Sequence, residues 1–579
     1  MSGRDRWNSR TAFVMAAIGS AVGLGNVWRF PVTCYKYGGG AFFIPYFVAL
    51  LTAGIPLMIL EYGIGQMMQG SAPKSLSRVN KHTEWVGWFA LLITLVISIY
   101  YAIIMAYAVE YLFYAAKGFF SGGKMAWSAP TAGITGTFEA SFFAGTIRSH
   151  SSSASEMWQL VWPLVGGLAV TWTAVYFILC RGVRRVGKVV MLTVPLPVIV
   201  LAILAVRGLT LPGSSAGIVY YLTPNFEALK DPATWLAAYG QIFFSLTLGF
   251  GVMIAYASYM PRDSDITNNA FITCFANCAT SFLSGFVVFS VLGFLAYQKG
   301  GVDVSSVIAA GPGLVFVTYP TAVSQMGQFG WLWPPLIGLL FFLMLLFLGI
   351  DSLFSLIEGI TTGLRDRYNL LSQKFLTAIV CILSLVVGII FFASRAGIHW
   401  LDIFDHWAND YGLVVVGLLQ CVIVGYFFKT DTLRDYINQV SEIKLWGWWE
   451  LCIRIITPLV LAYLIFSNLI NEITGSSLYG ASGTDFDRYL WVAPVSFAFL
   501  FVIAFSLARL WKVLALIGGG VIVALVTWLL LPAPAPLSTS IFSGLAAAVL
   551  FGGLFICLAI ARRGKETVIN INHQAGNEK

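Results

Sequence analysis

The sequence consists largely of long apolar segments joined by short polar loops, and this pattern constrains the fold more than any other feature. About fourteen such segments are present, with coarse bounds at residues 11–36, 40–68, 85–118, 159–181, 186–207, 234–260, 267–298, 333–363, 373–394, 398–428, 446–470, 488–511, 513–531 and 539–562. A helix needs about 20 mostly apolar residues to cross a bilayer. Because lipid offers the backbone no hydrogen-bond partners, each segment must form a helix. The sequence predicts an all-α polytopic membrane protein with about 14 transmembrane helices.

The composition argues against a soluble protein. Hydrophobic residues make up 58% of the chain and charged residues 10%, whereas soluble domains carry about 25% charged residues. The net charge of +8 suits nucleic-acid binding in a soluble protein, but here the basic residues gather in alternate loops. They are Lys74, Arg78, Lys81, Arg181, Arg184, Arg185, Lys188, Arg365, Arg367, Lys374, Lys429, Arg434, Lys444, Arg562, Arg563 and Lys565. Such a bias marks the cytoplasmic side. We expect both termini in the cytoplasm, a plasma membrane of the bacterial inner-membrane type, and no nucleic-acid partner.

Two apolar segments are interrupted in the same way. The first contains the run Gly-Ser-Ala-Val-Gly-Leu-Gly-Asn at 19–26, and the sixth contains Ser-Leu-Thr-Leu-Gly-Phe-Gly at 245–251. They are five spans apart, so they cross the membrane in opposite directions. Paired glycine-interrupted segments at matching positions indicate an inverted repeat with a binding site near the bilayer midplane. Close packing of small residues between helices is the alternative interpretation, but packing does not require the polar side chains found beside these glycines.

An interrupted helix has a definite chemistry. Its unpaired carbonyl oxygens suit Na⁺, and the positive N-terminal end of a half-helix suits a carboxylate. The sequence therefore favours a sodium-coupled carrier of a small solute.

Several longer motifs carry a resemblance to a known family. They are Gly-Leu-Gly-Asn-Val-Trp-Arg-Phe-Pro at 23–31, Gly-Gly-Gly-Ala-Phe at 38–42, Ile-Pro-Tyr at 44–46, Gly-Gln-Ile-Phe-Phe-Ser-Leu at 240–246 and Gly-Ile-Asp-Ser at 349–352. With them, residues 1–512 resemble the neurotransmitter:sodium symporter family, and in particular a bacterial-type amino acid transporter with an extended C-terminus. The resemblance implies the LeuT-type fold, a 5+5 inverted repeat with discontinuous helices 1 and 6.

The resemblance also implies a division of the chain. We expect a cytoplasmic N-terminal gate segment at 1–10, a first repeat at 11–207, a second repeat at 234–428, helices 11 and 12 at 446–511, two additional helices at 513–562 and a cytoplasmic tail at 563–579.

Two sodium sites and one chloride site are implied by matching the family's motifs. The first sodium site is expected to use Ala21, Asn26, Ser245 and Asn277, and the second Gly19, Val22, Leu348, Asp351 and Ser352. The chloride site is expected at Tyr46, Gln241, Ser245, Asn277 and Ser281. Chloride-independent bacterial relatives have a carboxylate where this chain has Ser281. A missing negative charge beside Na⁺ invites an anion, so we expect chloride to stimulate transport.

A substrate pocket is implied in the same way. Its expected residues are Ser20, Ala21, Leu24, Gly25, Ile97, Tyr101, Phe244, Ser245, Thr247, Phe250, Ser352, Ser355 and Leu356. Monoamine carriers of the family have an aspartate at the position of Gly23. Glycine leaves that volume to a substrate with its own carboxylate, which favours a neutral amino acid. Ser20 and Thr247 keep taurine, GABA, betaine or another small osmolyte open as substrates.

Gates are implied at both ends of the pocket. Arg29 and Asp405 match the outer pair, with Phe250 as a lid. Arg4 and Asp366 match the inner pair, with Trp7 as a plug. Gln420 departs from a glutamate common in the family, while Glu61 keeps the family's acid in the second span.

Other classes of function fit less well. The chain has no metalloprotease, serine-hydrolase or phosphate-loop motif, so an enzyme is not expected. An amino-acid-binding sensor or a channel-like protein on the same fold stays open, because fold does not fix function. We expect a monomer or homodimer in the lipid bilayer.

Overall fold

The computed structural model describes residues 5–129, 137–148, 159–308, 311–368 and 371–474, together with residues 500, 503 and 504. In this part of the chain the secondary structure is helical, apart from isolated bridges between Gly39 and Pro224 and between Leu160 and Ser394. It contains 9 helices long and apolar enough to cross a membrane, or 10 when one bent pair counts as a span. The all-α, multi-pass prediction is confirmed. The expected helices at 513–531 and 539–562 lie outside the described residues, as does most of 488–511.

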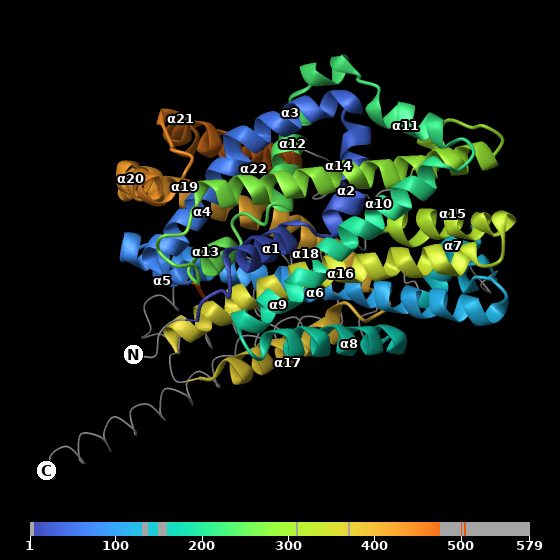
Figure 1. Ribbon diagram of the computed structural model, residues 1–579, viewed down its shortest axis with the longest axis horizontal. Coiled ribbons are helices and arrows are strands. Elements are labelled where there is room, and N and C mark those ends of the chain that lie inside the picture. Colours follow the sequence, from blue (N-terminus) through green and yellow to red (C-terminus); the bar gives the residue numbers. More distant parts are fainter. Residues whose placement is uncertain are drawn as a thin grey trace, which may run out of the picture.

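The observed helices follow the predicted segments closely. The first half contains α1 Arg10–Ala21, α2 Leu24–Lys36, α3 Phe43–Ala49, α4 Ile55–Met68, α5 Ala72–Val79, α6 Glu84–Gly118, α7 Phe138–Ser141, α8 Trp162–Leu179, α9 Val183–Thr193, α10 Pro195–Leu209 and α11 Ser214–Leu222 (Figure 1). The second contains α12 Pro232–Ser245, α13 Val252–Ala257, α14 Thr267–Gln298, α15 Tyr319–Gln325, α16 Trp333–Arg367, α17 Gln373–Phe391, α18 Gly397–His406, α19 Val414–Val422, α20 Thr430–Val440, α21 Gly447–Leu451 and α22 Thr457–Thr474.

The first span is broken where the sequence predicts it. Ser9 starts α1 by accepting a 3.1 Å hydrogen bond from the backbone N–H of Ala12. The helix ends at Val22, whose backbone is extended, and α2 restarts after Gly23. The axes of α1 and α2 differ by 50°. The chain therefore crosses this region as two half-helices.

The sixth span is broken as well. α12 ends at Ser245, and α13 begins only at Val252. Between them Thr247, Gly249 and Gly251 have φ angles of 56°, 83° and 74°. Glycine adopts such angles without steric cost, but a β-branched threonine does so rarely. The conformation of Thr247 is therefore held by its surroundings.

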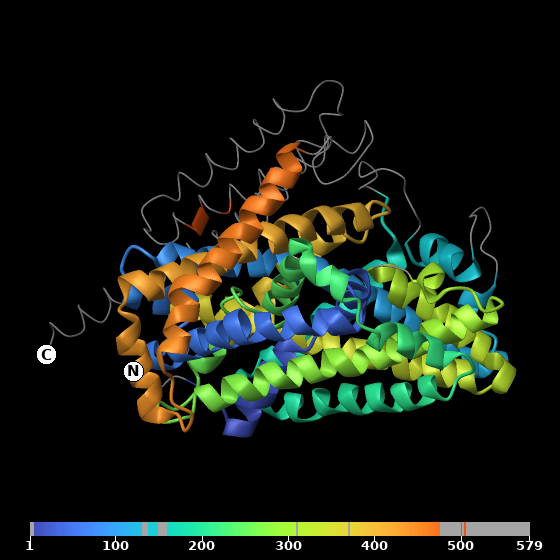
Figure 2. The same ribbon diagram turned by 90° about the horizontal axis from the view of Figure 1, so that it is seen from above.

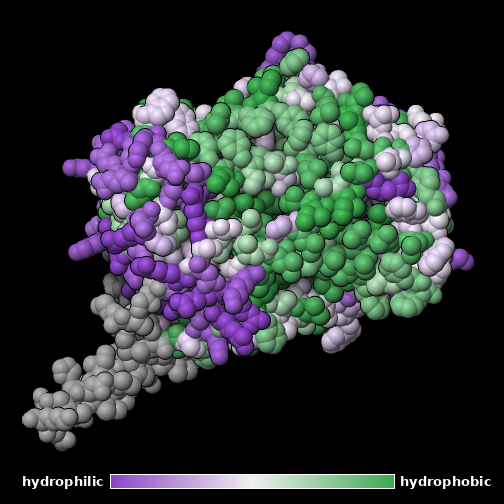
Figure 3. All heavy atoms as spheres, viewed as in Figure 1, coloured by the Kyte–Doolittle hydropathy of each residue, from purple (hydrophilic) through white to green (hydrophobic). Residues whose placement is uncertain are grey.

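The helices pack around α6 and α16, which lie against each other along the bundle (Figure 1). α22 runs obliquely across one side (Figure 2, orange). Polar residues collect chiefly at the end near the N terminus, α5 and α20, while apolar residues cover most of the visible surface (Figure 3). Large side chains such as Phe177, Leu192 and Val206 are more than half exposed. In a multi-pass protein these side chains face lipid.

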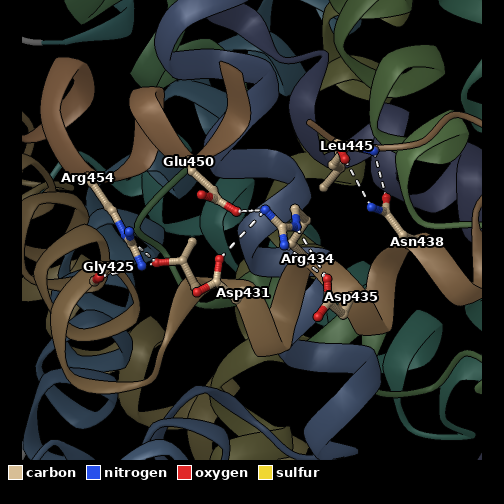
Figure 4. A network of polar contacts seen from close by, with 9 residues as sticks. Gly425, Asp431, Arg434, Asp435, Asn438, Leu445, Glu450 and Arg454 are labelled. Carbon is tan, nitrogen blue, oxygen red and sulfur yellow. Dashed lines mark hydrogen bonds and ion pairs between the residues drawn. The ribbon is translucent and has the colours of Figure 1, made fainter. Parts of the chain in front are cut away.

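The short helix α20 lies at one end of the bundle (Figure 1) and is held there by a polar network (Figure 4). Arg434 forms ion pairs with Glu450 of α21 and, at 3.2 Å and 3.6 Å, with Asp435 and Asp431. The Arg454 Nε–H donates a 2.8 Å hydrogen bond to the Thr430 hydroxyl. α20 is thereby tied to α21 and to the segment after it.

Candidate functional site

The two helix breaks contact each other. The hydroxyl of Thr247 donates a 2.9 Å hydrogen bond to the carbonyl of Ser20 in the last turn of α1. At the start of α2, a Cβ on Gly25 would lie 3.4 Å from the Phe244 ring. The irregular backbones of the first and sixth spans thus share one buried region.

A cluster of amides and hydroxyls lies on one side of the breaks. The Asn26 side-chain amide donates to the Asn277 Oδ1 at 2.8 Å and to the Ser281 hydroxyl at 2.7 Å. The Asn277 amide in turn donates to the Ser245 hydroxyl at 2.9 Å. The Asn26 Oδ1 accepts from the Gly23 N–H at 2.9 Å, which holds the side chain at the break. The side chains expected at the first sodium site therefore lie together, and Ala21, expected to add its carbonyl, is the last residue of α1.

Unpaired polar atoms belong to two residues expected at the chloride site. The Tyr46 hydroxyl and both polar atoms of the Gln241 amide are buried without a hydrogen-bond partner in the described structure. Burying such groups unpaired costs about 1–3 kcal/mol each. The O–H of Tyr46 and the side-chain N–H of Gln241 are hydrogen-bond donors. At a site that lacks a carboxylate, such donors suit an anion.

Oxygen atoms converge on the other side of the breaks. The Ser352 hydroxyl lies 3.3 Å from the carbonyl of Leu348 and 3.5 Å from that of Gly19. Asp351 is 2% exposed, and its Oδ1 has no hydrogen-bond partner in the described structure. A Cβ on Gly19 would lie 3.2 Å from the other Asp351 carboxylate oxygen.

The carbonyl of Val22, the remaining expected member of this second set, lies at the end of α1. It accepts none of the backbone hydrogen bonds found among the described residues. A buried carboxylate in an apolar span is expensive and normally functional. Unpaired carboxylate and carbonyl oxygens are the ligands that a hard cation prefers, so the donor set fits Na⁺.

The N-terminal end of α2 carries the features expected of a carboxylate site. The Leu24 N–H donates to the Tyr101 hydroxyl at 3.4 Å. A Cβ on Gly23 would lie 2.9 Å from the Ser352 hydroxyl and 3.4 Å from that of Tyr101. This is the start of a helix, where backbone N–H groups and the dipole favour an anionic group.

Hydroxyl groups line the neighbouring end of the expected pocket. The hydroxyls of Ser20 and Ser355 are hydrogen-bonded at 2.8 Å, across α1 and α16. The rings of Phe244 and Phe250 lie 6.5 Å apart. Ile97 and Leu356 are buried on α6 and α16.

The expected outer gate residues are not paired with each other. The Arg29 guanidinium lies 4.7 Å from the centroid of the Phe244 ring and forms no ion pair with any described residue. Asp405 instead accepts a 2.6 Å hydrogen bond from the Asn409 amide. The aromatic ring against Arg29 is that of Phe244. Phe250, the expected lid, is buried, and its role stays a prediction.

The expected inner gate is closed by contacts that differ in part from those expected. Trp7 is 7% exposed, and its indole N–H donates to the carbonyl of Tyr256 at 2.9 Å. Asp5 pairs with Arg365 at 2.6 Å. Asp366 accepts hydrogen bonds from the Ser71 N–H and Lys74. Arg4 lies outside the described residues, so its pairing with Asp366 stays a prediction.

Two further side chains, for which the sequence predicted no contact, hold the break of the sixth span. Glu61, in α4, accepts a 3.0 Å hydrogen bond from the Gly249 N–H, and the Thr94 hydroxyl donates to the carbonyl of Phe250 at 2.9 Å. Both hold the irregular segment after α12. Glu61 was recognised from the sequence as an acid typical of the family, but no contact was predicted for it; for Thr94 the only signal is a polar residue inside an apolar span. The amide of Gln420 is buried without a hydrogen-bond partner in the part that the structure describes.

Comparison with known proteins shows which family this chain resembles. The sodium:neurotransmitter symporter family matches residues 4–513. A sodium-dependent transporter of Methanocaldococcus jannaschii is 38% identical over 484 residues, 83% of this chain and 94% of that protein. The sodium-dependent dopamine transporter of Caenorhabditis elegans is 35% identical over 506 residues, 81% of each chain. The sodium- and chloride-dependent taurine transporter of Bos taurus is 35% identical over 483 residues, 79% of this chain and 77% of that protein.

Proposed function

Because the chain belongs to the sodium:neurotransmitter symporter family, a family of transporters and not of enzymes, we propose that it imports a small zwitterion with Na⁺ by alternating access. The main support for this proposal is the contact between the two helix breaks through Thr247 and Ser20. Oxygen-rich groups lie on both sides of this contact. The breaks provide backbone groups for ions and solute at one place without many full charges.

Two sodium ions fit the two oxygen sets. Asn26, Ser245 and Asn277 would hold one ion, together with the Ala21 carbonyl and the carboxylate of the substrate. Asp351 and Ser352 would hold the other, with the carbonyls of Gly19, Val22 and Leu348. Binding of the first ion is then linked to binding of the solute, because they share a ligand.

Chloride fits the remaining groups. The unpaired hydroxyl of Tyr46 and amide of Gln241 are donors, and Ser245, Asn277 and Ser281 lie in the neighbouring hydrogen-bonded cluster. An anion here would offset the charge of the nearby sodium ion. The relative from Bos taurus is a sodium- and chloride-dependent transporter, which supports the same requirement in this chain.

A neutral amino acid is the proposed substrate. Tyr101 and the N–H groups at Leu24 and Gly25 would bind its carboxylate at the start of α2. The absence of a side chain at Gly23 leaves room there, since a Cβ would crowd Ser352. The hydroxyls of Ser20 and Ser355 at the other end keep taurine, GABA, betaine or another small osmolyte as the alternative, and the taurine transporter among the relatives gives it weight.

Alternating access would use the two gates. Trp7 and the Asp5–Arg365 pair would close the inner side, while Arg29 and Asp405 would form the outer pair in another state of the cycle. We assign the lid to Phe244, because its ring stacks under Arg29. We further propose the 5+5 inverted repeat, which the breaks in the first and sixth spans support. Cytoplasmic termini and a plasma-membrane location are proposed from the basic loops.

Accumulation against a gradient tests the proposal. Purified protein in proteoliposomes should accumulate labelled solute when Na⁺ is imposed outside, and lose it when the Na⁺ gradient is dissipated. A panel of amino acids, taurine, GABA and betaine, each in NaCl, sodium gluconate and KCl, would identify the substrate and the chloride requirement. Binding without accumulation would instead indicate a sensor, and flux without Na⁺ coupling a channel.

A pocket variant tests the site separately. Phe250→Ala should lose solute binding while its sodium-dependent thermal stability stays within a few degrees of wild type. Unchanged solute affinity in that variant would contradict the pocket assignment.

A further inference from the structure

A strongly basic turn joins α8 to α9. Gly182, with φ of 74°, turns the chain between the two helices. The turn and the first two turns of α9 carry four basic residues, which we call the basic elbow: Arg181, Arg184, Arg185 and Lys188. Arg181, Arg184 and Lys188 are exposed and Arg185 is partly exposed. Within the described residues, none of the four side chains forms an ion pair or a hydrogen bond.

The place of these charges on α9 is unusual. Arg184 and Arg185 lie in the first turn, which contains no acidic residue. The N-terminal end of a helix carries a partial positive charge that disfavours cations and favours anions. A bound anion would pair with the free guanidinium groups. It would also offset their electrostatic repulsion with the helix dipole.

The elbow lies where the lipid-facing surface begins. Farther along α9, Met191 and Leu192 are 48% and 65% exposed, and Ile199 of α10 is 55% exposed. These residues belong to one apolar span, Val183–Leu209. In Figures 1 and 3, α9 lies toward the end at which polar residues gather. The basic side chains therefore stand at the level of lipid headgroups.

The inner side of the elbow supports the gate segment. The Asn8 amide donates a 3.0 Å hydrogen bond to the carbonyl of Arg184. A Cβ on Gly187 would lie 3.2 Å from that of Ala12 and 3.7 Å from the Trp7 ring. Any ligand of the elbow would thus bind on the outer side of the helix against which Trp7 rests.

We propose that the basic elbow binds the headgroup phosphate of an anionic phospholipid. Clusters of basic residues at the end of a transmembrane helix attract acidic lipids. A free phosphate shares the charge but lacks acyl chains, and exposed apolar side chains such as Met191 and Leu192 follow the elbow along the same helix. Binding of lipid here is independent of which solute the protein carries.

Native mass spectrometry of the full chain in detergent can test this, with phosphatidylglycerol and phosphatidylcholine of identical acyl chains as probes. Wild type should bind phosphatidylglycerol at least about a hundredfold more tightly than phosphatidylcholine. Each basic residue near an acidic headgroup contributes a factor of about five. The triple variant Arg184→Gln/Arg185→Gln/Lys188→Gln should therefore bind phosphatidylglycerol roughly a hundredfold more weakly.

A matched control removes the same number of exposed charges elsewhere on the polar end. Lys81→Gln/Arg262→Gln/Lys374→Gln should keep phosphatidylglycerol binding within about twofold of wild type. If the elbow triple variant fails to fold, the single variant Arg185→Gln serves as the test. It should bind phosphatidylglycerol about fivefold more weakly than wild type. Equal binding of the two lipids, an equal loss in the control, or displacement of phosphatidylglycerol by millimolar inorganic phosphate would each overturn the proposal.

Discussion

The Thr247 hydroxyl donates a 2.9 Å hydrogen bond to the carbonyl of Ser20, and this bond joins the break of the sixth span to that of the first. Thr247 has a φ of 56°, a conformation that costs about 1–3 kcal/mol for a residue other than glycine. The hydrogen bond helps to offset this cost. A movement of one break is therefore transmitted to the other through this hydrogen bond.

Removal of this bond should weaken the coupling between the breaks. Thr247→Val keeps the shape and loses the hydroxyl, and a net loss of about 1 kcal/mol corresponds to a roughly fivefold rise in the Na⁺ concentration for half-maximal uptake. Thr247→Ser should stay near wild type. Thr171→Val is the control, because the Thr171 hydroxyl bonds only within α8. Equal Na⁺ activation curves for Thr247→Val and Thr171→Val would contradict this role.

Asp351 should be required for sodium activation. Asp351→Asn keeps the size of the side chain and removes a buried charge that has an unpaired oxygen among the described residues. We expect at least a tenfold higher Na⁺ requirement, or about 1.4 kcal/mol, measured as uptake against Na⁺ concentration. Asp303→Asn, in an exposed loop, should leave the curve unchanged. Normal Na⁺ activation in Asp351→Asn would remove Asp351 from the proposed sodium site.

A carboxylate at position 281 should replace chloride. The Ser281 hydroxyl lies 2.7 Å from the Asn26 amide, near the unpaired Tyr46 and Gln241 groups. Ser281→Glu would supply a fixed negative charge, so uptake in sodium gluconate should rise to within about twofold of uptake in NaCl. Ser281→Ala supplies no charge and should keep the chloride requirement. Persistent chloride dependence in Ser281→Glu, with normal Na⁺-dependent folding, would contradict the site.

The sequence predicted the bounds and the breaks of the long helices, because these depend on the order of apolar, polar and glycine residues within a single segment. The helix predicted at 267–298 is observed as Thr267–Gln298, and both breaks occur at the glycine-rich runs, because glycine and polar residues interrupt a long apolar segment. The contact of Arg29 with Phe244 and the pairing of Asp5 with Arg365 were not predicted. They depend on how neighbouring helices are rotated and which side chains meet. α20 was missed because it is short and amphipathic.

The pair between Asp5 and Arg365 gives a test of the inner gate. The two side chains are 39% and 36% exposed, so their ion pair contributes at most about 1 kcal/mol. As a switch between two states of similar energy, it still changes their ratio by up to roughly fivefold. A Ser258→Cys reporter lies beside Tyr259, whose carbonyl accepts a hydrogen bond from the backbone N–H of Trp7. Its alkylation rate reports opening of the gate.

Arg365→Gln should raise this alkylation rate up to about fivefold. The reversed pair Asp5→Arg/Arg365→Asp should return the rate to that of wild type. Arg367→Gln, with a neighbouring charge removed, should have no effect. A rate in Arg365→Gln equal to that in Arg367→Gln would show that the closed gate rests on Trp7 and its contacts with α13 instead of on this ion pair.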